Sequence, residues 1–431
     1  MNSADVRRKH RKYLFPAVKN YYQESIVIVK GRGSRVTDLD GRTYLDFFAG
    51  ILTVSVGHAN EEVNRAVTAQ VAQLSHTSTL YPTLPIVELA EKLANLTPGK
   101  LEKCFFTASG TEADETAVMM AQIFTGNFEL IALRHGYSGR SLLAQSLTAH
   151  AAWRAMPTQA PAIKHALAPY CYRCPLKLTY PDCGVACAQD VEELIQTTTT
   201  GQVAGILVEP IMGVGGFITP PQEYFVIVAE IVRKYGGIFI SDEVQTGFGR
   251  TGQMWGIDQY GVVPDMITVA KGIANGLPLG AVITTAEIAD SLTKNSISTF
   301  GGNPVSCAAA GATIDVILRD KLADNAQAMG AVLREGLVRL QQKYPKVIGE
   351  VRGMGLMQAI ELVVDETAGD RTPNPEAENQ IMEQTKERGL LLGRGGLYGN
   401  VLRIAPALNI TQDEVDEATG ILDQSFAAMG V

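Results

Sequence analysis

Short apolar runs alternate with longer segments of helical periodicity through the middle of the chain, from about residue 60. The apolar runs have the length of β-strands and lie at 101–109, 128–134, 203–210, 236–243 and 265–270. Segments between them, such as 112–124 and 221–235, repeat their apolar residues at the three- and four-residue spacing of an amphipathic helix. Buried strands that alternate with helices predict an α/β fold with a mainly parallel sheet, covered by helices on both faces.

The two ends of the chain have different patterns. Residues 34–56 predict a hairpin, since two β-rich runs meet at Asp40-Gly41, a dipeptide that favours a type I′ turn. After about residue 315, a helical segment at 325–344 precedes a strand-like segment at 347–363, which suits a smaller α/β domain. We therefore predict an N-terminal segment and hairpin that belong to the small domain, a large domain and a C-terminal small domain, at 1–60, 61–314 and 315–431.

Composition and charge narrow the class of protein. The 431 residues exceed the roughly 250–300 that one core organises, so a large and a smaller domain are expected. With 46% hydrophobic and 19% charged residues the chain has a globular composition, and its net charge of −8 argues against nucleic acid as a partner. No apolar stretch reaches the roughly 18 residues of a membrane span, and none follows the basic N-terminus as in a signal peptide. We expect no membrane partner and a cytoplasmic location.

A small polar turn joins the first predicted strand to the helix after it. Ser109-Gly110-Thr111 would place free backbone N–H groups and two hydroxyls at a helix start, where phosphate groups bind. The same residues also suit an ordinary helix N-cap. Asp242, at the carboxyl end of another predicted strand, can be a metal ligand, a base or a polar cap. These residues alone do not decide whether 109–111 binds phosphate or only caps a helix, or which of the three roles Asp242 has.

Lys271 follows the strand-like run 265–270 in an apolar, glycine-rich stretch with no adjacent carboxylate. Its stem can lie along an apolar surface while the ammonium stays in water. Burial would instead lower the pKa of the lysine and leave a nucleophilic amine that can form a Schiff base. A phosphate seat, a strand-end carboxylate and a buried lysine together indicate a pyridoxal 5′-phosphate (PLP) site, with Asp242 at the pyridine nitrogen and Lys271 at the aldehyde.

Long motifs support this interpretation. They are ILVEPIMGVGG, DEVQTGFGRTG, PDMITVAKGIANGLPLGAV, STFGGNP and RHGYSGRS. The chain resembles the class III (omega) aminotransferases of PLP fold type I over nearly its whole length, from YLDFFAGI to LRIAPALNIT. The segments GLPLGAVITTAEIADSL and VRGMGLMQAIELV look most like the alanine–glyoxylate aminotransferase 2-like branch. The resemblance implies a large domain with a mainly parallel sheet between helices, and a smaller α/β domain built from both termini.

The resemblance also implies how each matching residue contacts the cofactor. It places Ser109, Gly110 and Thr111 at the phosphate, Tyr137 and Val244 on the two faces of the ring, Gln245 at the phenolic oxygen, Asp242 at the pyridine nitrogen and Lys271 at the aldehyde. It places Thr299 at the phosphate of a neighbouring subunit, which implies a homodimer, or a dimer of such dimers, with shared sites. Tyr137 has a plainer interpretation, because an aromatic residue after a strand usually packs in the core.

Two further residues match positions that select the substrate. Arg403 matches the family's carboxylate-binding arginine, and its planar guanidinium suits that task. Glu209 matches a glutamate that pairs with this arginine when the amino donor has no α-carboxylate. We expect the pair to open and close to admit both kinds of substrate. Arg403 can also be a structural ion-pair residue.

The expected reaction is transamination by a ping-pong mechanism. An amino acid or ω-amine of the alanine, β-alanine or 4-aminobutyrate type gives its amino group to a 2-oxo acid of the pyruvate or glyoxylate type, and Lys271 moves the proton. A PLP-dependent phospho-amine lyase or an aminomutase on the same fold is the alternative. A lyase needs cations for a second phosphate, and the sequence does not place Arg134, Arg140 and Arg394.

Four of the six cysteines fall in one segment, at Cys171, Cys174, Cys183 and Cys187. Their spacing resembles that of a compact zinc site, and four thiolates would hold the Pro-containing loop together. Free thiols, a redox pair and an iron–sulfur cluster are the alternatives, while structural disulfides do not suit a reducing cytosol.

Overall fold

The computed structural model describes residues 1–18 and 20–430. Its main sheet has seven strands in the order β4-β10-β9-β8-β7-β5-β6. These strands are β4 (Lys103–Thr107), β5 (Leu130–Leu133), β6 (Ile163–Ala166), β7 (Gly205–Val208), β8 (Ile238–Asp242), β9 (Met266–Val269) and β10 (Gly280–Thr284). Among the described residues, β10 pairs antiparallel with both of its neighbours, β4 and β9, and every other pair in this sheet is parallel. The mainly parallel sheet predicted from the hydrophobic pattern is confirmed.

Successive side chains of each strand enter two different cores, one on each face of the sheet. On one face, Ile238 and Ile240 of β8 pack with the alanine-rich side of α5 (Gly110–Thr125). On the other, Phe239 packs with α8 (Tyr224–Lys234). Helices therefore cover both faces of the sheet, as the pattern predicted.

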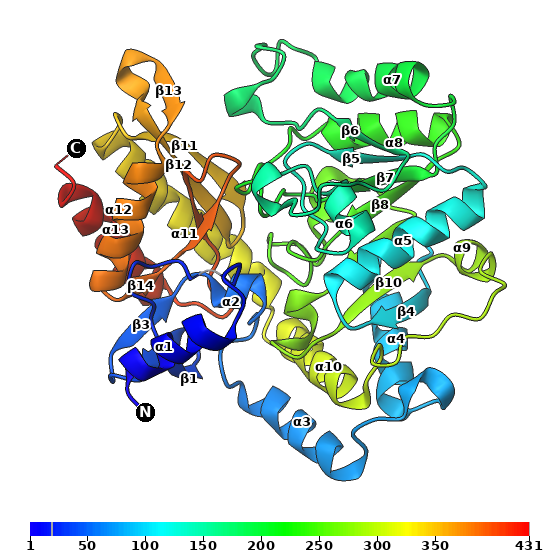
Figure 1. The fold of residues 1–431 in the computed structure, drawn as a ribbon, viewed down its shortest axis with the longest axis horizontal. Helices are drawn as coiled ribbons and strands as arrows, with labels where there is room; N and C mark the ends of the chain where they lie inside the picture. Colours follow the sequence, from blue (N-terminus) through cyan, green and yellow to red (C-terminus); the bar gives the residue numbers. More distant parts are fainter. Residues whose placement is uncertain (19, 431) are drawn as a thin grey trace.

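Two smaller sheets lie beside the main one and bring the chain ends together (Figure 1). The first contains β1 (Ile28–Arg32), β2 (Arg35–Asp38), β3 (Thr43–Asp46) and β14 (Leu390–Leu391). The second contains β11 (Ile348–Met354), β12 (Met357–Asp365), β13 (Asp370–Pro373), β15 (Gly393–Gly395) and β16 (Val401–Ile404). The parallel pairing of β3 with β14 joins the N-terminal segment to the C-terminal part.

The predicted hairpin is only half correct. Strands β2 and β3 pair antiparallel, and Gly41 in their turn has a φ of +88°. The β-structure ends at Asp46, whereas we predicted that it continues to residue 56. The Asp46 carboxylate accepts the N–H groups of Phe48 and Ala49, at 3.0 and 2.9 Å, and this local bonding turns the chain into α2 (Ala49–Leu52).

The remaining helices lie either around the main sheet or around the two smaller sheets (Figure 1). The longer ones are α1 (Ser3–Tyr13), α3 (Glu61–Gln73), α4 (Leu84–Leu96), α7 (Ala186–Thr198), α10 (Pro304–Arg319), α11 (Leu322–Lys343), α12 (Pro375–Glu387) and α13 (Gln412–Ala427). The shorter ones are α6 (Leu142–Leu147), α9 (Ala286–Asp290) and the 3₁₀ turns η1 (Ser78–Leu80), η2 (Ala151–Trp153), η3 (Cys171–Arg173), η4 (Gly256–Tyr260), η5 (Lys271–Ala274) and η6 (Glu366–Ala368). Among the described residues, no helix is long and apolar enough to cross a membrane. The division at residues 314 and 315 falls inside α10 and stays a prediction.

Candidate active site

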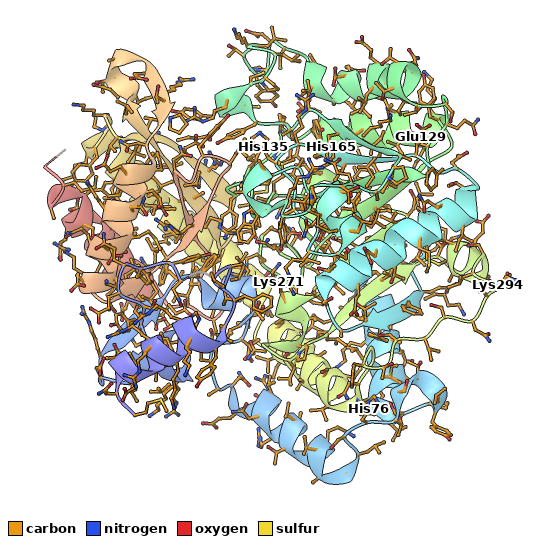
Figure 2. The ribbon with its side chains drawn as sticks, in the orientation of Figure 1. His76, Glu129, His135, His165, Lys271 and Lys294 are labelled. Carbon is orange, nitrogen blue, oxygen red and sulfur yellow. The ribbon has the colours of Figure 1, made fainter. Side chains whose placement is uncertain are left out.

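Lys271 lies where the main sheet meets the N-terminal segment. Figure 2 shows Lys271 between the elements of the main sheet and those of the two smaller sheets. It begins η5 directly after β9, with a φ of +45°, and a Cβ added at the next residue, Gly272, would lie 2.6 Å from the Ser55 hydroxyl. Burial lowers the pKa of the Lys271 amine, although the carboxylates of Asp242 and Glu209 oppose this effect. Lys271 as a whole residue is half-buried, and its surroundings favour the neutral amine.

Asp242 ends β8, the strand beside β9, and only 4% of its surface is exposed. Its ladder partner on β9 is Thr268, three residues before Lys271. The Asp242 carboxylate accepts the Val244 N–H at 3.0 Å. Burial raises the pKa of Asp242 to about 6, while that N–H and the Lys271 charge favour the ionised form. A buried carboxylate and a half-buried lysine thus lie at the carboxyl ends of adjacent parallel strands, where open α/β sheets bind ligands.

The turn 109–111 begins α5 beside these two residues. Ser109 is an N-cap, since its hydroxyl accepts the Glu112 N–H at 3.3 Å. A Cβ added at Gly110 would lie 3.2 Å from Val244 and 3.4 Å from Ala270. A Cβ at Gly139, whose φ is +134°, would overlap the Thr111 hydroxyl. Gly110 and Gly139 thus allow a close approach of the chain at the N-terminus of this 16-residue helix. Both the N-cap and the phosphate-seat interpretations fit this arrangement.

Tyr137 and Gln245 are both joined to the segment 209–213. The Tyr137 N–H donates to Glu209 at 3.0 Å, and the Tyr137 ring packs edge-on against Trp153, with centroids 5.6 Å apart. A Cβ at Gly213 would overlap the Gln245 side chain. The Gln245 Oε1 atom is buried without a hydrogen-bond partner among the described residues. A buried amide oxygen without a partner indicates that a ligand or water supplies one.

Arg403 and Glu209 both bind the backbone of Gly213. The Glu209 carboxylate accepts the Gly213 N–H at 2.8 Å, and Arg403 Nη1 donates to the Gly213 carbonyl at 3.2 Å. Arg403 lies on β16, 3% exposed, with its guanidinium 4.8 Å from the Phe48 ring centroid. Within residues 1–18 and 20–430, the two side chains form no direct ion pair, so the expected pairing is absent from this conformation.

Thr299 is the predicted residue that lies apart from this group. It is exposed in the segment between α9 and α10, next to Phe300, which is 63% exposed. No hydrogen bond joins Thr299 to the other predicted residues within the described parts of the chain. Its assignment to a neighbouring subunit stays a prediction.

PLP suits the residues present. The helix N-terminus with its close glycines can receive the phosphate, the unpartnered Gln245 oxygen can meet a ring substituent, Asp242 supplies a carboxylate and Lys271 supplies the amine. Sequence reasoning missed Gly213, which joins Glu209 to Arg403, and Asp114, which is 1% exposed on α5. The signal for Asp114 was a single carboxylate on a helix face that otherwise carries alanine and valine.

The zinc prediction is not supported. All four residues, Cys171, Cys174, Cys183 and Cys187, are free and line one small, mainly apolar cavity. Among the described residues, no group of three His, Cys, Asp or Glu side chains could hold a metal ion. Burial raises the pKa of the Cys171 thiol to about 11 and that of the Cys187 thiol to about 12, which favours neutral thiols.

Comparison with known proteins adds independent information. Residues 17–426 match the family model described as aminotransferase class-III. An Arabidopsis thaliana protein, alanine–glyoxylate aminotransferase 2 homolog 2, mitochondrial, is 43% identical over 99% of this chain and 88% of its own length. A Pseudomonas putida 5-aminovalerate aminotransferase is 37% identical over 93% of both chains. The PLP-bound structure of an amine transaminase from an uncultivated Pseudomonas species is 31% identical over 97% of this chain and 98% of that chain, with a TM-score of 0.90.

Proposed function

Because the chain belongs to the class III aminotransferases and is thus a PLP-dependent aminotransferase, we propose that it transfers amino groups from both α-amino acids and ω-amines. The donors are of the alanine, β-alanine or 4-aminobutyrate type, and the acceptor is a 2-oxo acid such as pyruvate or glyoxylate. The observation that carries this proposal is the shared contact of Arg403 and Glu209 with Gly213. An arginine whose pairing with a glutamate can change is able to accept or release a substrate carboxylate.

The chemistry of the site follows from the charges of its residues. When bound, PLP supplies an aldehyde for attachment and a ring that withdraws electrons from the substrate carbon. Asp242 would hold a proton at the pyridine nitrogen with its buried carboxylate. Lys271 Nζ, favoured in its neutral form by burial, would take a proton from the substrate carbon and return it as the general acid. Ser109, Gly110 and Thr111 would bind the phosphate, and Tyr137 and Val244 would orient the ring.

Substrate selection falls to Arg403 and Glu209. Arg403 is always charged at neutral pH and can bind a carboxylate through two parallel hydrogen bonds. Glu209 already accepts two backbone N–H groups, from Tyr137 and Gly213, so its position is fixed. Burial and the charge of Asp242 raise the pKa of Glu209, which favours its neutral form. An approaching guanidinium would oppose both effects and favour the ionised carboxylate. Arg403 would thus pair with Glu209 when the donor has no α-carboxylate.

The alternative reactions are less well supported. A phospho-amine lyase needs free cations for a second phosphate. Arg394, whose carbonyl accepts from Arg403 Nε at 2.6 Å, already donates to the Glu378 carboxylate at 2.8 Å. Arg134 and Arg140 are exposed. Product analysis decides the matter: a transaminase needs the 2-oxo acid for turnover, whereas a lyase or an aminomutase does not.

A homodimer with shared sites, or a dimer of such dimers, is part of the proposal. It is supported by the exposed position of Thr299 and by apolar side chains on the same surface, with Ile297 and Phe300 65% and 63% exposed. Light scattering would give the mass of the assembly. Mixing Thr299→Ala with Lys271→Ala chains would test sharing, because a mixed dimer would then contain one site with both natural residues.

The expectation of a cytoplasmic location also stays a proposal, which fractionation of the source cell would test. The donor range needs a screen. We expect the purified, PLP-loaded protein to transfer amino groups from both alanine and 4-aminobutyrate to pyruvate or glyoxylate. Activity confined to one donor class would contradict the proposed exchange between Arg403 and Glu209.

A further inference from the structure

Asp114 lies inside the main sheet's helical cover, next to Asp242. It is on α5, 1% exposed, and the hydroxyl of Thr268 donates to its Oδ1 atom at 2.7 Å. Thr268 is also the ladder partner of Asp242. Side chains of paired residues leave the same face of a sheet, so Asp242 lies beside Thr268 on the face that Asp114 contacts, and the charge of Asp242 acts on Asp114. Two carboxyl groups from different elements therefore share one buried contact.

Such a pair has to hold a proton. Two ionised carboxylates in a buried contact repel each other and lose their hydration, so one of them keeps a proton at neutral pH. Within the described residues, neither carboxylate forms an ion pair with an arginine, lysine or histidine in contact with it. The Lys271 charge favours the ionised form of both carboxyl groups.

The hydrogen bonds decide which carboxyl is neutral. Asp242 accepts a backbone N–H, from Val244, which favours its ionised form. Within the described part of the chain, the Asp114 carboxyl accepts only the Thr268 hydroxyl. Burial and the charge of Asp242 raise the pKa of Asp114 well above its usual range. The proton is thus favoured on Asp114.

We propose that Asp114 is a positioning residue, a neutral acid that donates a hydrogen bond to the Asp242 carboxylate and thereby keeps Asp242 ionised and oriented toward the cofactor's pyridine nitrogen. This inference rests on the proposed role of Asp242. It assigns Thr268 a supporting part, because its hydroxyl occupies Asp114 Oδ1 and leaves Oδ2 for the proton. The proton stays on Asp114 during turnover and is not transferred to Asp242.

Two substitutions separate the neutral acid from its alternatives. Asp114→Asn keeps an oxygen for Thr268 and an N–H donor for Asp242, so it copies the protonated acid. Asp114→Leu keeps the approximate volume but removes the donor. A hydrogen bond to a charged group contributes enough to change a binding constant by about 10- to 100-fold. We expect the PLP dissociation constant to rise by about that factor in Asp114→Leu and by less than about threefold in Asp114→Asn.

Infrared spectroscopy tests the protonation state without any measurement of activity. In PLP-loaded protein labelled with ¹³C-aspartate, we expect a neutral carboxyl band at about pH 7.5 that is absent from Asp114→Asn. This pH lies above the raised pKa of Asp242, which is about 6, so Asp242 itself is ionised. Absence of the band from the natural protein, or its persistence in Asp114→Asn, would overturn the inference. So would equal PLP affinity in the Leu and Asn variants. Failure of the natural protein to bind PLP would instead contradict the proposed function, which keeps the two results distinct.

Discussion

Glu209 and Arg403 both bind the backbone of Gly213, through the two peptide groups that flank this residue. The N–H of Gly213 donates to Glu209 at 2.8 Å, and its carbonyl accepts from Arg403 at 3.2 Å. Gly213 thus connects the two side chains that the proposed exchange involves. In that proposal, the Glu209 carboxylate and a substrate carboxylate compete for the one guanidinium of Arg403.

The first prediction concerns Glu209. Replacing it with glutamine removes the charge that can pair with Arg403 but keeps the side-chain length. We expect kcat/KM for 4-aminobutyrate to fall about tenfold relative to kcat/KM for alanine, because a charge-assisted hydrogen bond is lost only with the donor that has no α-carboxylate. Steady-state rates with both donors check this. Glu192→Gln, whose partner is the surface residue Lys234, is the matched control. An equal fall with both donors would contradict the exchange.

The second prediction concerns pH. Burial raises the pKa of Asp242 to about 6 in the free chain, so the carboxylate is ionised above that pH and becomes neutral below it. Binding of PLP by the free protein should therefore weaken as pH falls through about 6. Titrations of PLP at several pH values measure the effect. Asp242→Asn should bind PLP weakly at every pH, without the additional loss of affinity below about pH 6. An identical pH dependence in both proteins would contradict the role given to Asp242.

The third prediction uses the glycine beside Thr111. Gly139→Ala places a methyl group on the Thr111 hydroxyl, in a backbone conformation with a φ of +134°. We expect the PLP dissociation constant to rise by about tenfold or more, since overpacking at this contact displaces the start of α5. Gly126→Ala is the control, because it also has a positive φ, +70°, but faces open space. If both variants weaken PLP equally, general strain and not the contact with Thr111 is responsible.

The fourth prediction concerns the cysteine segment. Elemental analysis of protein purified without chelator should find no stoichiometric zinc or iron, because no described group of side chains converges on a metal position. Thiol titration after denaturation without reductant should find all six cysteines. One metal ion per chain, or fewer than six thiols, would contradict the free-thiol description.

The sequence predicted elements with a strong local signal and missed those that depend on tertiary contacts. Residues 128–134 gave β5 because they are apolar, whereas β6 contains Lys164 and His165 and has no apolar run. Strand β10 was hidden in a glycine-rich motif. The segment after Asp46 looked β-rich, but the Asp46 carboxylate bonds it into a turn.

The candidate site divides in the same way. Lys271 and Asp242 follow predicted strands, and parallel strands bring their carboxyl ends together, so their proximity could be expected. The contact through Gly213 could not, since it joins a loop of the main sheet to β16, 190 residues apart in sequence. Asp114 could not be assigned either, because only the pairing of β8 with β9 shows that Thr268 links it to Asp242.

The central claim is that Lys271 is the residue to which PLP attaches. Borohydride reduction of the PLP-loaded protein, followed by digestion and mass spectrometry, tests it most directly. The account predicts one pyridoxyl group per chain, on the peptide that contains Lys271, and none in Lys271→Ala. A pyridoxyl group on another lysine, or none in the natural protein, would contradict it.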